Sequence, residues 1–595
     1  MTIKLNEQQA AAVDHPGNVL VTACPGSGKT RVLTHRIIKE LSELESTKHR
    51  VIAVTFTNRA ADEIKSRLDD PEICLDQLWA GTIHSFSLDW ILRPYACYSK
   101  YLKKGFSVAD EFYIRRLKNN LKEKYGFNYY DEIETKFDRN GNTVSCSTNE
   151  KEFINEYHKL LFERKLIDFD LVLYFTYELM IRMSEIPKTL GAIIRSICID
   201  EYQDTQDLQY GILSEIVKKS SGFTKVFIVG DVNQAIYSSL GGIAKSRQEI
   251  IQEFEIDQLA HLRLTGNYRS TQRIIDLSID LQDDETEVVS LANYADERGI
   301  ITFNNQDYHK DDLPELIAKM VAFHINNGVP SHEICILAPQ WWLITSLGRK
   351  LVTILPDVKF DAPGLSPFHH QRDNIWFKIA RLFLVEPEPR LFLPRLRWAG
   401  SVIRELEYLI GTDIPDEYRT ARRLLRLTNT IKSAETDGIA YLEDVFHQLM
   451  MKIKIIIDDY SSLMEPWDSF FAKAYDRLKD PEYNIPSDII SLKKMFKRPG
   501  GVVVTTCHSI KGEEYETVIC YGILEGYIPN WQLIYDSNVD ENIEARRLLY
   551  VISSRAKKNL HLISELGRMT QRGHSYCTNQ NIDCVTCEYD ELNIY

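Results

Sequence analysis

The most informative absence in this chain is a long apolar run. No stretch approaches the roughly 20 uninterrupted apolar residues that a membrane-spanning helix requires, and residues 1–9 are polar, without the apolar segment of a secretory signal. We therefore expect a cytoplasmic protein. Positive charge is also in deficit, because 71 lysines and arginines stand against 85 aspartates and glutamates, a net charge of −14. This balance argues against a protein that coats nucleic acid, so any DNA contact must use a local basic groove.

Cysteine spacing gives no sign of a disulfide framework. The eleven cysteines are scattered, and several fall in apparent strands, which suits small buried thiols in a reducing compartment. Internal repeats and low-complexity tracts are also missing. A length of 595 residues predicts roughly three to five ordinary globular domains.

The strongest pattern is a strand, a glycine-containing loop and a helix in succession. An apolar run ends at Ala23, residues 25–28 cannot continue it, and residues 29–41 have helical spacing. This is the context of a P-loop, whose backbone N–H groups close around phosphate oxygens. Lys29 would reach the terminal phosphates, and the Thr30 hydroxyl would hold Mg²⁺. Ala23 replaces the usual first glycine, and the alternative is an ordinary glycine turn before a helix.

A second apolar run, residues 197–199, is followed directly by the carboxylates of Asp200 and Glu201. Asp200 would complete the shell of the Mg²⁺ ion, and Glu201 would position or deprotonate the attacking water. The alternative is an acidic cap between a strand and a helix. In an α/β sheet ligands bind at the carboxyl ends of the strands. Three more apolar runs end in polar residues, namely 51–58, 79–86 and 225–234.

Taken in order, these motifs resemble those of the UvrD/Rep/PcrA-like superfamily 1A helicases. Asp200-Glu201-Tyr202-Gln203-Asp204-Thr205 is close to diagnostic of that family. The resemblance implies an α/β protein with two RecA-like P-loop cores, each a parallel sheet flanked by helices, and two mainly helical insertions. The matching segments are Gln9, 23–30, 55–58, 81–85, 200–205, 230–231, 264–270, 504–514 and 544–556.

The resemblance also implies seven segments. They are the first core 1A (1–87 and 191–265), the helical insertion 1B (88–190), the second core 2A (266–384 and 498–566), a reduced helical insertion 2B (385–497) and a C-terminal tail (567–595).

By resemblance, ATP would be hydrolysed between the two cores. Arg269 and Arg555 match arginine fingers, which are worth roughly 10³–10⁵ in rate, and Gln234 matches a sensor of the γ-phosphate. Both arginines come from the second core, so hydrolysis would require the cores to close. The residues expected to act in catalysis are Lys29, Asp200, Glu201, Gln234, Arg269 and Arg555, with Thr30 and Asp200 holding the Mg²⁺ ion.

Nucleotide binding is expected at both cores. Tyr268 and Arg31 match a pair that sandwiches the adenine, Gln9 is placed to read the adenine edge, and Glu514 matches a ribose contact. A glutamine near a helix start is more often simply solvated. The expected nucleotide-binding residues are Gln9, Ala23, Cys24, Pro25, Gly26, Ser27, Gly28, Lys29, Thr30, Arg31, Tyr268 and Glu514.

Single-stranded DNA, or a junction of single and double strands, is the expected second ligand. Phe56 and Tyr237 occupy positions where family members stack bases. The alternative for each DNA-binding candidate is a core aromatic or a satisfied polar residue. After Tyr237 the family continues with an aromatic and an arginine, whereas this chain reads Ser238-Ser239-Leu240, which weakens the case for processive unwinding. The expected DNA-binding residues are Phe56, Thr82, His84, Tyr237, His508 and Ser509.

Two further patterns keep alternatives open. Four arginines recur at roughly helical spacing, namely Arg419, Arg422, Arg423 and Arg426. They would face duplex phosphates or a protein partner; the alternative is a solvated basic face of a helix. The tail has a histidine and three cysteines at spacings that suit zinc, namely His574, Cys577, Cys584 and Cys587. The alternative is that the three cysteines are ordinary free thiols.

The predicted function is an ATP-dependent single-stranded DNA translocase or helicase, with 3′→5′ polarity by resemblance. It would act in DNA repair, or in anti-phage defence like the helicase-like partner of an OLD-like nuclease in Gabija. The tail is too short for a nuclease domain, so we expect any nuclease to be a separate chain. The alternative is an ATP-sensing regulatory subunit that gates such a nuclease without unwinding DNA.

Overall fold

The structure is a computed structural model. It describes residues 5–68, 75–109, 111–128, 131, 133–143, 147–237, 241–282, 287–362, 368, 374–479, 487–494, 496, 500–530, 540–570 and 572–592.

The first sheet has six parallel strands in the order β3-β2-β6-β7-β1-β8. Its four inner strands are mostly apolar and buried, as expected for a sheet covered by helices on both faces, whereas the edge strands β3 and β8 are more exposed. The strands are β1 (Val19–Ala23), β2 (Arg50–Thr55), β3 (Leu78–Thr82), β6 (Ile194–Ile199), β7 (Lys225–Gly230) and β8 (Ala260–Leu264). The helices are α1 (Glu7–Asp14), α2 (Lys29–Ser42), α3 (Asn58–Arg67), α9 (Glu185–Ile193), α10 (Asp207–Lys219) and α11 (Arg247–Phe254).

The second sheet is also parallel and six-stranded, in the order β11-β16-β15-β12-β14-β13. Its strands are β11 (Ile301–His309), β12 (Ile334–Ala338), β13 (Phe360–Asp361), β14 (Val502–Thr506), β15 (Tyr515–Tyr521) and β16 (Ala556–Leu566). Around it lie α12 (Gln272–Ile279), α13 (Leu313–Asn326), α14 (Trp341–Ile354) and α22 (Glu541–Ser553), with a small sheet of β9 (Gly266–Asn267) and β10 (Val289–Ser290).

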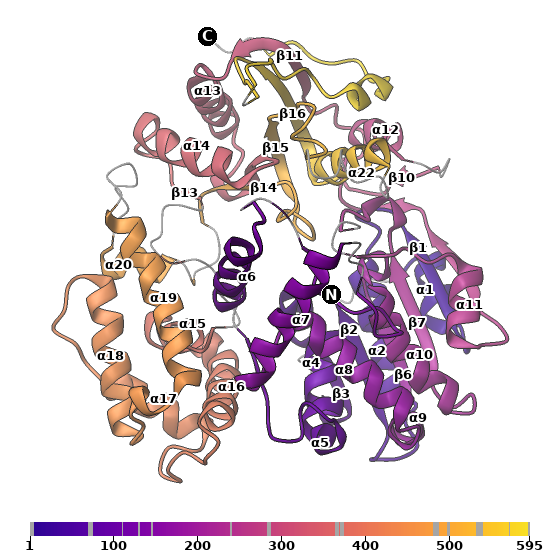
Figure 1. Cartoon of the computed structure of the whole chain (residues 1–595). Helices are drawn as coiled ribbons and strands as arrows, with labels where there is room; N and C mark the ends of the chain where they lie inside the picture. Colours follow the sequence, from indigo (N-terminus) through magenta and orange to yellow (C-terminus); the bar gives the residue numbers. More distant parts are fainter. Residues whose placement is uncertain are drawn as a thin grey trace.

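Two helical segments interrupt the sheets, and Figure 1 shows them below the second sheet. The first lies between β3 and β6, and the second between β13 and β14. The first contains α4 (Ile83–Phe86), α5 (Arg93–Tyr95), α6 (Glu111–Tyr125), α7 (Thr148–Glu163) and α8 (Phe169–Arg182), with short strands β4 (Ser107–Val108) and β5 (Leu166–Ile167). The second contains α15 (Ile375–Leu384), α16 (Phe392–Ile410), α17 (Ala421–Thr430), α18 (Gly438–Lys452), α19 (Ser461–Lys479) and α20 (Ile489–Lys494).

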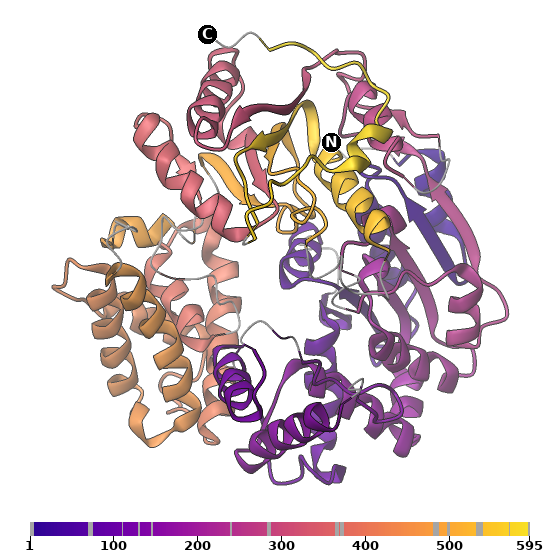
Figure 2. The same ribbon diagram turned by 45° about the horizontal axis from the view of Figure 1, so that its top comes forward.

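The second helical segment has a hydrophobic core of its own. Trp376 on α15 is fully buried there and packs against Phe446 and Trp467. Helix α15 therefore packs with the helical segment, although the sequence analysis assigned residues 375–384 to the second core. The expected fold class is confirmed: two parallel sheets flanked by helices, with two helical segments between their strands (Figures 1 and 2).

Among the described helices, none combines the length and the apolar character that crossing a bilayer would need.

Candidate active site

The P-loop connects β1 to α2, and two of its glycines have left-handed backbones. Gly26 has a φ of +69° and Gly28 a φ of +82°, values that favour glycine. A Cβ on Gly26 would lie 2.6 Å from Cβ of Arg269 and 2.7 Å from Oδ1 of Asn267. Tyr268 also donates its backbone N–H to the carbonyl of Gly26 at 2.9 Å. The segment that precedes α12 therefore lies directly against the P-loop, and glycine is what permits the approach.

Gln9 supports the P-loop from α1. It is 1% exposed, and its Nε2 donates to the carbonyl of Ser27 at 2.9 Å while its Oε1 accepts from the backbone N–H of Asn6. Its predicted contact with adenine stays a prediction. Asn6 in turn donates to the hydroxyl of Tyr268 at 2.9 Å, so α1 ties the P-loop to the predicted adenine-binding residue. Arg31, its predicted partner, lies in the first turn of α2.

The connection from β1 into the loop is compact. Ala23 ends β1, Cys24 is buried, and Ser27 donates its hydroxyl to the carbonyl of Cys24 at 2.7 Å. The hydroxyl of Ser27 is thus used inside the loop, and Lys29 and Thr30, which are predicted to bind the phosphates and Mg²⁺, begin α2.

The acidic pair follows β6, and its two carboxyl groups have different surroundings. Lys29 Nζ lies 3.8 Å from Oε1 of Glu201. Burial raises the pKa of Asp200, and the charge of Glu201 raises it further. Burial acts on Glu201 in the same direction, but the charges of Lys29 and Lys511 outweigh it and hold its pKa low. Asp200 is therefore a buried carboxyl group for which the charge of Lys29 does not offset burial and the charge of Glu201, and a hard oxygen donor of this kind fits a divalent cation.

Gln203 positions Glu201, a role that the sequence analysis did not assign. Its Nε2 donates to the carboxylate of Glu201, and its Oε1 accepts from the backbone N–H of Asp231 at 3.1 Å. A side chain on Gly230 would collide with that amide. The signal was present, because Gln203 belongs to the near-diagnostic hexapeptide, but only its first two residues received roles.

Lys511 is a second residue that the sequence analysis missed. Its ammonium group donates to Oδ2 of Asp204 at 2.6 Å and to the carbonyl of Gln234 at 2.7 Å. Lys511 follows β14 of the second sheet, whereas Asp204 and Gln234 follow strands of the first sheet. This buried ion pair therefore joins the two sheets beside the acidic pair.

Both predicted arginine fingers lie at the junction of the two sheets. Arg555 is 2% exposed; it donates to Oε1 of Gln234, whose Nε2 donates to Oδ2 of Asp231 at 2.7 Å. Burial, with the charge of Arg269, lowers the pKa of Arg555 to about 10. Arg269 pairs with Glu514 at 2.7 Å and donates to the carbonyl of Ser554 at 2.9 Å, so the predicted ribose contact here holds an arginine finger.

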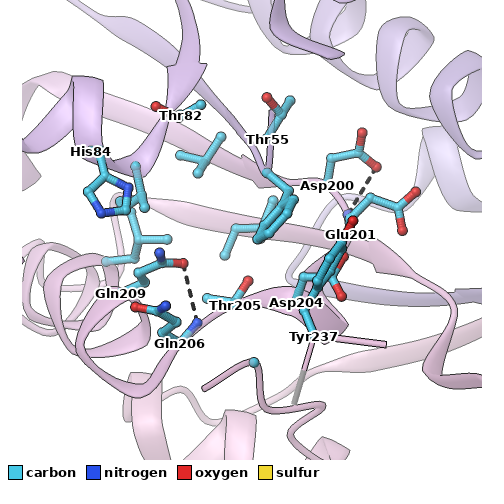
Figure 3. A pocket seen from close by; sticks show the side chains of 16 residues that line it. Thr55, Thr82, His84, Asp200, Glu201, Asp204, Thr205, Gln206, Gln209 and Tyr237 are labelled. Atoms are coloured by element: carbon cyan, nitrogen blue, oxygen red, sulfur yellow. Dashed lines mark hydrogen bonds between the residues drawn. The ribbon is translucent and has the colours of Figure 1, made fainter. Parts of the chain in front are cut away.

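A cavity of about 190 Å³ opens at the carboxyl ends of β2, β3 and β6. Asp200 and Glu201 lie at one end of it, and Thr82 and His84 at the other (Figure 3). Phe56 and Tyr237 also line it, and their rings stack at 4.9 Å with an interplanar angle of 21°. The structure thus brings four predicted DNA-binding residues into one cavity with the acidic pair.

The second sheet contributes the other two predicted DNA-binding residues. Tyr237 donates its hydroxyl to the carbonyl of His508 at 3.2 Å, and Lys511 Nζ lies 5.1 Å from the Tyr237 ring. Ser509 accompanies them, with its hydroxyl 2.8 Å from that of Thr506. The departure from the family at residues 238–240 lies outside the described residues.

The two remaining patterns from the sequence lie away from this site. Arg419 pairs with Glu407 and Asp413 of its own helical segment, while three arginines on α17 are exposed, Arg422, Arg423 and Arg426. In the part of the chain that the structure describes, no three histidine, cysteine or acidic side chains are arranged to hold a metal ion. Cys577 and Cys584 in the tail are exposed free thiols. The zinc hypothesis therefore finds no support.

Comparison with known proteins places this geometry in context. Residues 5–255 match the UvrD/REP helicase N-terminal domain, and residues 487–566 match the UvrD-like helicase C-terminal domain. ATP-dependent DNA helicase Rep of Escherichia coli is 25% identical over 94% of this chain and 90% of its own length. Rep of Buchnera aphidicola is 23% identical over 94% of both chains, and PcrA of Leuconostoc citreum is 23% identical over 96% of this chain and 83% of its own length.

Proposed function

The chain belongs to the UvrD-like family of superfamily 1A DNA helicases, and on that premise we propose that it is an ATP-driven, 3′→5′ translocase on single-stranded DNA. One observation carries the proposal. Arg555 of the second core is buried against Gln234 of the first, beside the P-loop and the acidic pair. An arginine in that place neutralises charge that develops on a transferred phosphoryl group only while the cores are closed.

The residues around the P-loop divide the chemistry among them. Lys29 and the loop N–H groups bind the phosphates. Glu201, held by Gln203, positions the attacking water and accepts its proton. Arg269 and Arg555 stabilise the charge on the γ-phosphoryl group. Thr30 and Asp200 would hold a Mg²⁺ ion, which neutralises phosphate charge when bound.

Movement would follow from the contacts that join the cores. Loss of the γ-phosphate removes negative charge that holds Arg269 and Arg555 in place, so the cores can separate. Lys511 and Tyr237 connect the same junction to the predicted DNA-binding residues His508 and Phe56. Opening and closing of the cores would therefore alter the grip on DNA within each ATP cycle.

The setting and the alternative are proposed from the family resemblance. A role in DNA repair competes with anti-phage defence beside an OLD-like nuclease, and with an ATP-sensing subunit that gates that nuclease. The sequence at residues 238–240 favours the last two, because a stacking aromatic is missing there. Unwinding of long duplexes by the isolated protein would count against both.

ATP hydrolysis with and without single-stranded DNA tests the proposal. A translocase is stimulated by single strands, and Lys29→Ala abolishes that activity. Turnover that ignores DNA and responds only to an added nuclease would refute the translocase and support the gating subunit.

A further inference from the structure

Two adjacent tryptophans on the second core are not used by the site described above. Trp341 and Trp342 begin α14, and they are 45% and 51% exposed. Tryptophan carries a large apolar surface, and it is enriched where proteins bind their partners. A neighbouring pair of half-exposed tryptophans therefore indicates a contact surface more strongly than one scattered apolar residue does.

The pair follows the strand next to β14. β12 pairs in parallel with β14, with Leu337 opposite Thr505 and Ala338 opposite Thr506. Beyond the strands, the backbone N–H of Cys507 donates to the carbonyl of Ala338 at 3.1 Å. Trp341 comes three residues after Ala338, so the tryptophans and the predicted DNA-binding residues His508 and Ser509 leave the sheet at the same edge.

The surroundings of the pair include basic side chains in a protein of net charge −14. The guanidinium of Arg568 lies over the Trp342 ring at 5.4 Å, and it pairs with the buried Glu565 at 3.0 Å. Helix α14 contains no acidic residue, and it carries Arg349 and Lys350. Lys350 is exposed and lies about two turns further along the same helix. A surface that combines flat aromatic rings with positive charge complements a nucleic acid strand better than an apolar protein partner.

We propose that Trp341 and Trp342 form a platform on the second core on which bases of single-stranded DNA stack. The proposal rests on the proposed translocase function and adds a binding site to it. Every base has an aromatic face, so stacking holds a strand without reading its sequence. The platform would supply on the second core the aromatic contact that the chain lacks at Ser239 of the first.

Binding of the full-length protein to fluorescein-labelled oligo(dT), followed by anisotropy at fixed salt, tests the platform. Stacking on one aromatic is worth about 1–3 kcal/mol per base, so the double variant Trp341→Ala/Trp342→Ala should bind roughly 5- to 150-fold more weakly. The double variant Trp341→Phe/Trp342→Phe should keep most of the affinity. Tyr475→Ala is the matched control, because Tyr475 is 39% exposed on α19 of the helical segment.

An oligonucleotide with abasic positions separates stacking from loss of fold. The wild type should bind this oligonucleotide more weakly than it binds oligo(dT). The double alanine variant should bind it at most about twofold more weakly than the wild type does, because there is no base to stack. A double alanine variant that binds oligo(dT) within twofold of wild type overturns the platform and points to a protein contact. If the wild type itself fails to bind oligo(dT), the proposed translocase function fails as well, so the two failures are distinguishable.

Discussion

In each core one strand, β3 in the first and β14 in the second, ends in the same pattern of residues: threonine, any residue, histidine and serine. In the first core the hydroxyl of Thr82 lies 3.0 Å from the hydroxyl of Ser85 and accepts the Ser85 backbone N–H. In the second core Thr506 and Ser509 repeat both contacts, with the hydroxyls 2.8 Å apart. The local structure is thus the same, because a threonine before a helical turn caps it through contacts only three residues apart.

The histidines inside the two patterns have different surroundings. His84 lies edge-on against Phe169, which belongs to the first helical segment, at 5.5 Å. His508 lies beside Tyr237 and close to Lys511, both at the junction of the cores. The pattern of the first core therefore contacts only the first half of the chain through its histidine, whereas the histidine of the second pattern contacts a residue of the other core.

The largest effect is expected where the second core reaches the first. Arg555→Ala should leave ATP affinity largely intact and lower turnover by roughly 10³-fold or more, because the γ-phosphoryl charge loses its buried cation. Single-turnover hydrolysis and fluorescent-nucleotide binding measure the two quantities. Arg298→Ala is the matched control, since Arg298 is exposed and pairs only with Asp590 among the described residues. If turnover survives the loss of Arg555, the assignment of the site to both cores is wrong.

Breaking the ion pair between the cores should have the next largest effect. Lys511→Met leaves the carboxylate of Asp204 buried without its cation, which costs about 3 kcal/mol and should lower the DNA-stimulated ATPase about 100-fold. The double variant with Asp204→Asn should recover part of the loss, because no buried charge then remains. Urea unfolding and ATPase rates measure the cycle. Strictly additive losses would show that the pair does not join the cores.

Replacing each histidine tests whether the two patterns are equivalent. His508→Ala should reduce stimulation of the ATPase by single-stranded DNA about fivefold, the value of one hydrogen bond near 1 kcal/mol. His84→Ala should reduce that stimulation less than His508→Ala does and should also lower stability, since its ring packs against Phe169 inside the first half of the chain. DNA titrations of the ATPase compare them. Equal losses of stimulation would mean that the two patterns act alike.

The smallest effect concerns pH. Burial lowers the pKa of His84 to about 4, whereas an unfolded chain titrates near 6.5. The unfolded chain therefore binds the proton more tightly, so the contribution of neutral His84 is complete above pH 6.5 and is lost as the pH falls toward 4. His84→Gln should make the fall in unfolding free energy over that range shallower, measured by urea unfolding at several pH values.

A second buried histidine contributes to the same dependence of the unfolding free energy on pH. Burial also lowers the pKa of His561, to about 3, in the second core, so part of the slope should persist in His84→Gln. An unchanged slope would show that His84 does not gain its proton on unfolding.

Much of the fold and the composition of the candidate site could be predicted from the sequence, because their signals are local. The P-loop from Ala23 to Thr30 is readable from its glycines and flanks. The fold class is implied by the resemblance of the ordered motifs to the superfamily 1A helicases. The zinc hypothesis for the tail found no support among the described residues, because spacing alone does not show whether side chains converge. The proposed platform of Trp341 and Trp342 had no signal in the sequence either, since exposure cannot be read from a motif.

The sequence by itself determined which residues form the P-loop, the acidic pair and the two threonine caps, since each depends on neighbours a few positions away. Only the tertiary structure decided that Lys511 pairs with Asp204 across 307 positions and Arg555 with Gln234 across 321. Those pairs depend on how two separately formed sheets pack, and their strength comes from burial, which removes the water that would otherwise compete for each charge.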